Sequence, residues 1–303
     1  LFIGLEASVA GGIPVIKVIK ESLIANKIIQ ITGILNGTSN YLLDAIQSKS
    51  LNFEKALKQA QDLGYAENDP SFDVNGMDAA HKIAILSAIV FDKLPNFEQL
   101  VVKGISDITL EDLNFADKLN YKIKLLAICT IENGFQCSVE PWLVPKNHSL
   151  SNINGVLNAI EIISDLSGPI LLTGAGAGPK ATASSVLSDL FDYLANSNRT
   201  GISNSTNSII KFNNIKPFKS KMKFYLKVSV LDKSGILADL TSIFKQNKIS
   251  IQSFYQDLKS SQKFANLFIV THEVERNVMD KAIQNIRNLK GTLNEIVCIS
   301  IYD

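Results

Sequence analysis

A polar stretch at residues 196–221, NSNRTGISNSTNSIIKFNNIKPFKSK, separates two apolar patterns in this chain. It is rich in Asn, Ser and Lys and poor in large apolar residues, which is typical of a linker. A chain of 303 residues, 46% of them hydrophobic, is long enough for two domains with at least one large core. The stretch therefore predicts one domain at 1–195 and a second at 222–303.

The segment after the linker reads as a complete small domain. Its pattern is strand, helix, strand, strand, helix, strand: KFYLKVSVL, ILADLTSIFKQNK, ISIQSFYQDLK, KFANLFIVTHE, ERNVMDKAIQNIRNL and LNEIVCISIYD. The order βαββαβ in about eighty residues is that of a compact α+β unit.

The segment before the linker predicts a larger α+β domain. KIIQITGIL at 27–35 is rich in β-branched residues and reads as a buried strand. MDAAHKIAILSAIVF reads as a helix that is apolar almost all the way round, so it should be largely buried. Another helix follows its N-cap Asn52 and ends at Gly64. Strand-like runs at 121–131, 136–144, 156–163 and 169–173 precede a helix at about 180–195, which predicts a mixed sheet with helices on one face.

The composition excludes several classes of protein. With 30 basic and 29 acidic residues, nothing points to nucleic acid or to an anionic membrane, and no apolar run reaches membrane-spanning length. The three cysteines are an odd number in apolar surroundings without CxxC spacing, so a disulfide framework or a zinc site is not expected. We expect Cys129, Cys137 and Cys298 to be buried thiols in a reducing cytoplasm.

The stretch GYAENDPSFDVNGMDAAHK, at 64–82, concentrates acidic residues ahead of the apolar helix: Glu67, Asp69, Asp73 and Asp78. A helix that begins near Gly76 puts Asp78 and Lys82 one turn apart on the same face. An exposed ion pair of this kind is worth about 0.3–0.5 kcal/mol. Because the helix lacks a broad polar face, we favour a pair that faces a cleft, with the loop carboxylates aimed into it. An acidic cleft suits a cationic group, such as the ammonium of an amino acid.

Two further segments allow both a structural and a functional interpretation. LTGAGAGPKATASSVLSDL, at 172–190, has the glycines of a dinucleotide loop, but Pro179 stands where the fingerprint requires glycine. It is either a tight strand-to-helix turn or a turn whose amides contact a phosphate. In GILNGTSNYLL, Gly37 and Thr38 either donate to a ligand or cap a helix.

Four segments, EASVAGGIP, GILNGTSNY, GYAENDPSFDVNGMDAAHK and GAGAGPKATASSV, resemble in order and spacing the catalytic domain of homoserine dehydrogenase. Residues 222–303 resemble an ACT domain, a small amino-acid-sensing module. The resemblance implies reversible hydride transfer between L-aspartate 4-semialdehyde and NAD(P)H, which gives L-homoserine in threonine and methionine biosynthesis.

The resemblance also implies roles for individual residues. Lys82 corresponds to the proton-transfer lysine and Asp78 to the acid at the substrate hydroxyl. Glu67 corresponds to the acid that holds the amino group, and Asp73 to a supporting carboxylate. The remaining candidates are Gly37 and Thr38 for substrate, Gly64 and Gly178 for cofactor, and Glu6 with the carbonyls of Val9, Gly11 and Ile13 for a monovalent cation, expected to be sodium.

The chain also departs from the family. Its members begin with a Rossmann domain that carries a GxGxxG loop and a further active-site lysine, so about 120 residues of a nucleotide-binding half are expected to be missing. Hydride transfer by this chain alone is then not expected. The alternative is a non-catalytic regulatory protein that binds an amino acid.

The candidate effector contacts lie in the second domain. Gly235, in the turn DKSGIL, and Ser253 and Gln256 on the next strand are placed to contact an amino acid, and the family's pathway makes threonine the expected effector. Otherwise Gly235 serves only the turn and the domain dimerises. Exposed edges of ACT-like sheets favour a homodimer or homotetramer.

Overall fold

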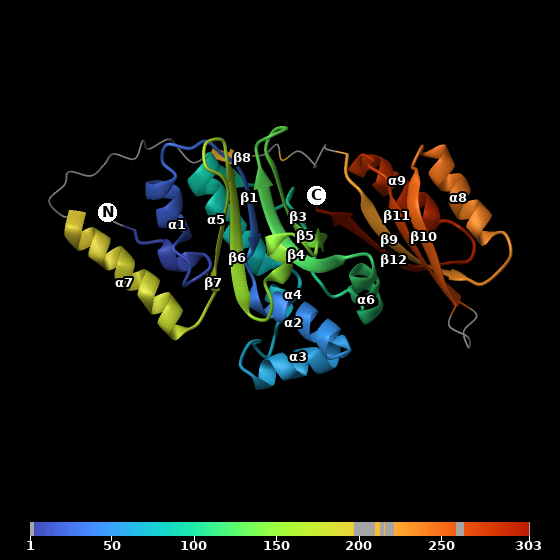
Figure 1. Cartoon of the computed structure of the whole chain (residues 1–303), viewed down its shortest axis with the longest axis horizontal. Helices are drawn as coiled ribbons and strands as arrows, with labels where there is room; N and C mark the ends of the chain where they lie inside the picture. Colours follow the sequence, from blue (N-terminus) through green and yellow to red (C-terminus); the bar gives the residue numbers. More distant parts are fainter. Residues whose placement is uncertain (1–2, 197–209, 213–214, 216–220, 259–263, 303) are drawn as a thin grey trace. The chain divides into compact units, whose positions relative to one another are not determined.

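The computed structural model describes residues 3–196, 210–212, 215, 221–258 and 264–302 (Figure 1). The chain divides into two compact units, Leu1–Pro141 with Lys146–Lys216 and Trp142–Pro145 with Pro217–Asp303. Most of the linker predicted at 196–221 lies outside the described residues. Within that segment, strand β8 (Ile210–Phe212) pairs in parallel with β2 (Lys93–Pro95). The domain boundaries at 195 and 222 stay predictions.

The first unit is built on a mixed sheet. Neighbouring strands follow the order β5, β4, β1, β6, β7, and the short β3 pairs in parallel with β5. Strand β1 is antiparallel to both β4 and β6, and β6 is antiparallel to β7. The five runs predicted as strands are confirmed, with ends that differ by at most two residues. The bounds are β1 (Ile28–Ile34), β3 (Val101–Val102), β4 (Tyr121–Thr130), β5 (Gln136–Pro145), β6 (Leu157–Ser164) and β7 (Gly168–Ala175).

Several helices pack against this sheet. Helices α2, α5 and α6 all pack against β4, which confirms the predicted α+β class. In Figure 1, α3 lies next to α2 at the bottom of the view, and α7 lies beside the segment that contains η1 and α1. The bounds are η1 (Glu6–Ser8), α1 (Val15–Lys17), η2 (Val18–Ser22), α2 (Gly37–Ser48), α3 (Phe53–Asp62), α4 (Ser71–Val74), α5 (Met77–Phe91), α6 (Leu110–Lys118), η3 (Ser149–Asn152) and α7 (Pro179–Asn196).

Helix α5 begins and packs as the sequence predicts. Its N-cap is Gly76, whose φ of +83° is in the left-handed region that glycine adopts without strain. Apolar residues such as Ile83 and Leu86 are completely buried. At α3, Asn52 caps the helix, because its side chain accepts a hydrogen bond from the Lys55 amide at 2.9 Å.

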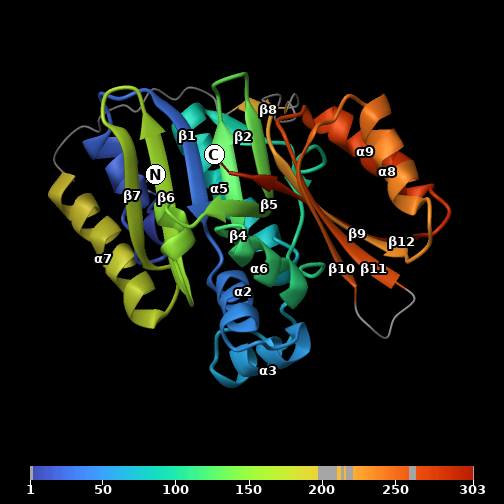
Figure 2. The same ribbon diagram turned by 45° about the vertical axis from the view of Figure 1, so that its right-hand side comes forward.

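The second unit has the predicted order βαββαβ. Its elements are β9 (Phe224–Leu231), α8 (Ile236–Gln246), β10 (Ile251–Leu258), β11 (Phe264–Thr271), α9 (Arg276–Arg287) and β12 (Thr292–Ile301). The strands lie in the order β10, β11, β9, β12 and each pair is antiparallel. Helices α8 and α9 pack together on the sheet (Figure 2). Trp142 and Leu143, which belong to this unit, pair in parallel with Ser300 and Ile301 of β12.

The prediction of three buried thiols is wrong. Cys129 on β4 and Cys137 on β5 form a disulfide, with their Cα atoms 4.2 Å apart. The two strands are neighbours in the sheet, and the strand pairing, which the sequence spacing did not reveal, brings the sulfurs together. Cys298 is partly exposed rather than buried. Among the described residues, no helix combines the length and the apolar character needed to cross a membrane.

Candidate active site

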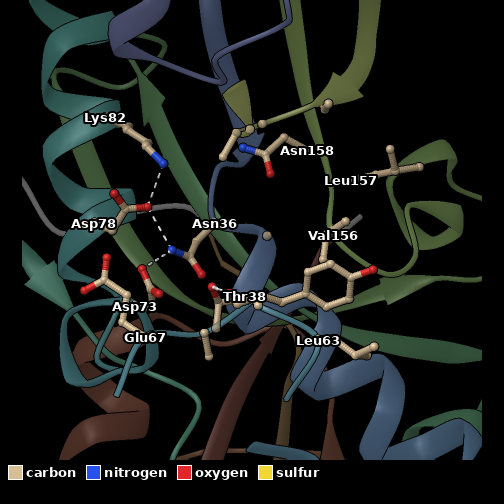
Figure 3. A pocket seen from close by; sticks show the side chains of 18 residues that line it. Asn36, Thr38, Leu63, Glu67, Asp73, Asp78, Lys82, Val156, Leu157 and Asn158 are labelled. Carbon is tan, nitrogen blue, oxygen red and sulfur yellow. Dashed lines mark hydrogen bonds and ion pairs between the residues drawn. The ribbon is translucent and has the colours of Figure 1, made fainter. Parts of the chain in front are cut away.

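A pocket of about 580 Å³ opens in the first unit (Figure 3). Five segments of the chain meet there: the start of α2, the loop after α3, the α4–α5 region, the start of β6, and the turn between β7 and α7. In Figure 3, Lys82, Asp78 and Asp73 lie on one side, and Val156, Leu157 and Asn158 on the other. The lining consists of Asn36, Gly37, Thr38, Leu63, Gly64, Tyr65, Ala66, Glu67, Asp73, Asp78, Lys82, Val156, Leu157, Asn158, Ala175, Gly176, Ala177 and Gly178.

Asp78 and Lys82 form an ion pair on the pocket wall. Lys82 Nζ lies 2.7 Å from Asp78 Oδ2 and donates to the Leu35 carbonyl at 3.0 Å. The two side chains are only 21% and 22% exposed, whereas the surface pair Lys58 and Asp62 is 72% and 62% exposed. The pair therefore faces the cleft predicted for it, and lower water access strengthens its electrostatic effect on a bound ligand.

Asn36 holds the two aspartates of the pocket side by side. Its Nδ2 donates to Asp73 Oδ1 at 2.7 Å and to Asp78 Oδ2 at 2.8 Å. Its Oδ1 accepts from the Ser39 amide at 2.8 Å and so caps α2. The amide compensates for the close approach of two like charges. Asn36 was not among the site residues predicted from the sequence, although it directly precedes the candidates Gly37 and Thr38.

The loop carboxylates do not all reach the pocket. Glu67 lies in the lining, and Gln61 Nε2 holds its backbone carbonyl at 3.1 Å. Asp69 was expected in the same cleft but is absent from the lining, so this expectation is wrong. Its Oδ1 instead accepts from the Ser71 amide at 3.0 Å. Hydrogen bonds from the Ser71 side chain and then its amide lower the pKa of the exposed Asp69 carboxyl.

The start of α2 and the loop after α3 are joined at the pocket. Thr38 Oγ1 donates to the Tyr65 carbonyl at 2.7 Å, and the Tyr65 ring contacts Tyr41 edge-on at a centroid distance of 5.1 Å. The cap of α2 is Asn36, so Gly37 and Thr38 occupy the first helical turn with their backbone at the pocket. Both residues line the pocket, and their contact with a substrate stays a prediction.

The glycine-rich turn lines the other side of the pocket. Gly178 of this turn has a φ of +113°, and Gly64, in the loop after α3, has a φ of +74°. At both glycines nothing lies within 4 Å of the position that a Cβ atom would take. At Gly176 a Cβ atom would come within 2.1 Å of Asn158 Cγ. The turn is therefore a close strand-to-helix connection that also leaves open space at the pocket, and the two interpretations of this segment are compatible.

Glu6 is a buried carboxylate that contacts the start of α1. Its Oε1 and Oε2 accept from the amides of Ile16 and Lys17 at 2.9 and 3.0 Å. Burial raises the pKa of its carboxyl, while those two backbone hydrogen bonds oppose the rise. Because Glu6 is only 2% exposed, little water reaches its carboxylate, and the amides of Ile16 and Lys17 take the place of water as donors.

Two of the carbonyls predicted to bind a cation already accept hydrogen bonds. The Gly11 carbonyl accepts from Ser185 Oγ, and the Ile13 carbonyl from the Val15 amide at 2.7 Å. A carbonyl oxygen has two lone pairs, so these bonds leave room for a further ligand. Cation binding at Glu6, Val9, Gly11 and Ile13 stays a prediction.

The candidate effector contacts are separated in the second unit. Gly235 is the N-cap of α8, with a φ of +96°. Ser253 and Gln256 are exposed on β10. They are three residues apart on a strand, so their side chains point to opposite faces and do not converge on one ligand within a single chain.

Comparison with known proteins identifies the family of this chain. The family model for homoserine dehydrogenase matches residues 14–191, and that for the ACT domain matches 224–291. Homoserine dehydrogenase of Pseudomonas aeruginosa is 38% identical, over 99% of this chain and 71% of that protein. The crystal structure of the Thiobacillus denitrificans homoserine dehydrogenase has a TM-score of 0.89 and 38% identity, and covers 98% of this chain and 69% of that chain.

A more distant structure contains a cofactor. A hyperthermophilic archaeal homoserine dehydrogenase in complex with NADPH has a TM-score of 0.55 and 27% identity, over 63% of this chain and 55% of that chain. Homoserine dehydrogenases are oxidoreductases, and NAD(P) dependence is typical of the family. By its family match and its relatives, this chain belongs to the homoserine dehydrogenase family and carries an ACT domain.

Proposed function

We propose that this pocket binds L-homoserine and that Lys82 moves the proton in its reversible oxidation to L-aspartate 4-semialdehyde. The observation that carries the proposal is the short contact of Lys82 Nζ with Asp78 Oδ2, 2.7 Å, on the wall of a pocket. A lysine held there can take the hydroxyl proton as the C=O bond forms, or return it to the alkoxide in reduction. NAD(P), when bound, takes up or supplies the hydride.

Asp78 is the positioning and charge-balancing partner in this proposal. It holds Lys82 from one side while the Leu35 carbonyl, 3.0 Å from Nζ, holds it from the other. Two fixed acceptors restrict the lysine to one region of the wall, so no reorganisation is needed when charge develops on the substrate oxygen.

The acidic and helical parts of the pocket suit the two ends of an amino acid. Glu67 and Asp73 supply negative charge for the α-ammonium of homoserine, and both lie in the lining. The backbone of Gly37 and Thr38 lies in the first turn of α2, where amides and the helix dipole favour an anion such as the α-carboxylate. Recognition of both ends would select an amino acid over a simple alcohol.

The cofactor side is assigned to the glycine-rich turn. Residues 175–178 line the pocket, and the open space at Gly64 and Gly178 allows a flat ring to approach the backbone. The residues present therefore fit the nicotinamide end of NAD(P). A sodium ion bound by Glu6 and the carbonyls of Val9, Gly11 and Ile13 would stiffen the turn at residues 9–13. That turn packs closely on the glycine-rich turn, because a Cβ at Gly11 would lie 2.8 Å from the Gly176 carbonyl.

The remaining proposals concern regulation and assembly. Threonine is the proposed effector of the ACT domain, through Gly235 and either Ser253 or Gln256. Because β10 pairs only with β11 among the described residues, its other edge is available for association in a homodimer or homotetramer. We place the protein in the cytoplasm, as a biosynthetic enzyme.

Replacing Lys82 by Ala tests the catalytic role. In this variant, kcat for homoserine oxidation should fall by about 100-fold or more, the range of general acid–base catalysis. Lys58→Ala removes an ion pair of the same i,i+4 spacing from the exposed face of α3 and should leave kcat unchanged. Full turnover by Lys82→Ala would refute the assignment. Homoserine binding without turnover in the unaltered protein would favour the non-catalytic amino-acid-binding alternative.

A further inference from the structure

A buried lysine behind the pocket wall takes no part in the site described above. Lys124, on β4, is only 3% exposed. Its Nζ donates to Asn40 Oδ1 at 3.0 Å and to the Ile153 carbonyl. Burial of a lysine is costly, and an apolar side chain of similar length would fill the same space more cheaply. Lys124 therefore has a specific polar task at this position.

Asn40 connects this lysine to one segment of the chain. It lies on α2 and is 1% exposed. The two hydrogens of its Nδ2 are shared among three carbonyls, those of Ile153 at 3.0 Å, Gly155 at 2.9 Å and, more weakly, Leu157 at 3.4 Å. The side-chain amide of Asn40 thus holds the whole of segment 153–157. Lys124 fixes the orientation of this amide by donating to Asn40 Oδ1.

Asp44 holds the same segment from the next turn of α2. Its Oδ2 accepts from the Gly155 amide at 3.1 Å. Gly155 has a φ of +61°, so the chain turns sharply at this point. Asn40 and Asp44 therefore contact both kinds of backbone group in the segment, carbonyl and amide.

The same segment continues into the pocket. Val156, Leu157 and Asn158 belong to the lining, across the pocket from Asp78 and Lys82 (Figure 3). The segment also passes close to the start of α2, because a Cβ at Gly37 would lie 2.8 Å from the Val156 carbonyl. A small shift of this segment would change the width of the pocket without moving Lys82.

We propose that Lys124 is a positioning residue for the homoserine dehydrogenase reaction, which acts through Asn40 to fix the wall segment 153–158. This rests on the proposed function, in which the pocket binds homoserine. Because the wall lies opposite Lys82, loss of Lys124 weakens substrate binding more than it slows the chemical step. In the Lys124→Met variant we expect KM for homoserine to rise at least about fivefold, with kcat changed less than about threefold.

Hydrogen exchange tests the inference without any ligand. The amides of Ile153, Gly155 and Leu157 are all hydrogen-bonded within this network or beside it. In Lys124→Met, peptides that cover 153–158 should exchange about tenfold faster, while peptides from β1 keep their protection. The control is Ile123→Val, at a residue on the same strand that is 2% exposed and faces the other side. If the peptides that cover 153–158 exchange at the same rate in Lys124→Met and in Ile123→Val, the proposal is overturned.

A second variant covers the case in which Lys124→Met does not fold. Asp44 is partly exposed, so Asp44→Ala is a milder change that removes the acceptor of the Gly155 amide. It should release the same peptides and raise KM in the same direction. Faster exchange at 153–158 with unchanged affinity for homoserine, measured by calorimetry, would overturn the positioning role. If the unaltered protein binds no homoserine, the proposed function fails, while the exchange data still decide whether Lys124 holds the segment.

Discussion

The side-chain amide of Asn36 lies 2.8 Å from Asp78 Oδ2, the same oxygen that contacts Lys82 Nζ at 2.7 Å. One carboxylate oxygen therefore accepts from both the α2 cap and the proposed proton-transfer residue. The same amide group of Asn36 also reaches Asp73 at 2.7 Å. The position of Lys82 thus depends on the start of α2 as well as on α5.

Replacing Asn36 by Asp should separate its two tasks. A carboxylate still caps α2, so the fold should persist, but it puts a third negative charge beside Asp73 and Asp78. We expect kcat/KM for homoserine to fall by more than about tenfold at neutral pH, because the added charge replaces the N–H donor that the two aspartates share.

The matched control is Asn52→Asp, which makes the same change at the cap of α3, away from the pocket. It should leave kcat/KM for homoserine unaltered. Equal kinetics in the two variants would show that Asn36 only caps its helix.

Glu67→Gln should weaken binding of the substrate ammonium while sparing the chemical step. Glu67 lies in the pocket lining, and a neutral amide of the same size removes the charge alone. We expect KM for homoserine to rise by about 10- to 100-fold with kcat changed far less, as measured by steady-state kinetics. Asp69→Asn, two residues away and outside the lining, should match the unaltered protein. A loss confined to kcat would contradict the proposed role of Glu67.

Local patterns in the sequence were sufficient to predict α5 and its ion pair. The apolar run, Gly76 as N-cap and the i,i+4 spacing of Asp78 and Lys82 all concern neighbours along one helix, where the geometry is regular. The order of elements in the second unit was predictable for the same reason. Helix α6 was missed, although Thr109 and Asp112 form a capping box that could have revealed its start.

Features that depend on contacts distant in sequence were not predictable. The Cys129–Cys137 bond depends on the pairing of β4 with β5. The contact of Asn36 with Asp73 and Asp78 joins residues 37 and 42 positions apart. A single sequence has no signal for such pairs, because the residues meet only after the sheet and its helices have packed.

Sodium should stabilise the protein by binding at the proposed cation site beside Glu6. Replacing sodium chloride by tetramethylammonium chloride at equal ionic strength should lower Tm by several degrees, since a ligand that binds only the folded state shifts unfolding. Glu6→Gln should abolish the difference between the two salts, whereas Glu140→Gln, another buried glutamate, should keep it. Equal Tm in both salts for the unaltered protein would exclude this site.

Lys124 should make stability depend on pH in the alkaline range. Burial, and then the nearby charge of Lys122, lower the pKa of Lys124 to about 8, against an opposing effect of Asp44. Above this pKa the neutral amine keeps two N–H donors, enough for Asn40 Oδ1 and the Ile153 carbonyl. The network therefore persists when the charge is lost.

The sign of the effect follows from which state holds more protons. Well below pH 8, Lys124 is charged in both the folded and the unfolded protein, so the full cost of burying the charge lowers the free energy of unfolding. Between about pH 8 and the ordinary lysine pKa of 10.5, the unfolded chain keeps a proton that the folded chain has lost, so stability rises with pH. From pH 8 to 9.5 the rise should be about 1.6 kcal/mol relative to Lys124→Met, because the folded protein is already half deprotonated at Lys124 at pH 8. Urea unfolding of both proteins, with Ile123→Val as control, measures this difference, and a constant difference across the range would contradict a lowered pKa at Lys124.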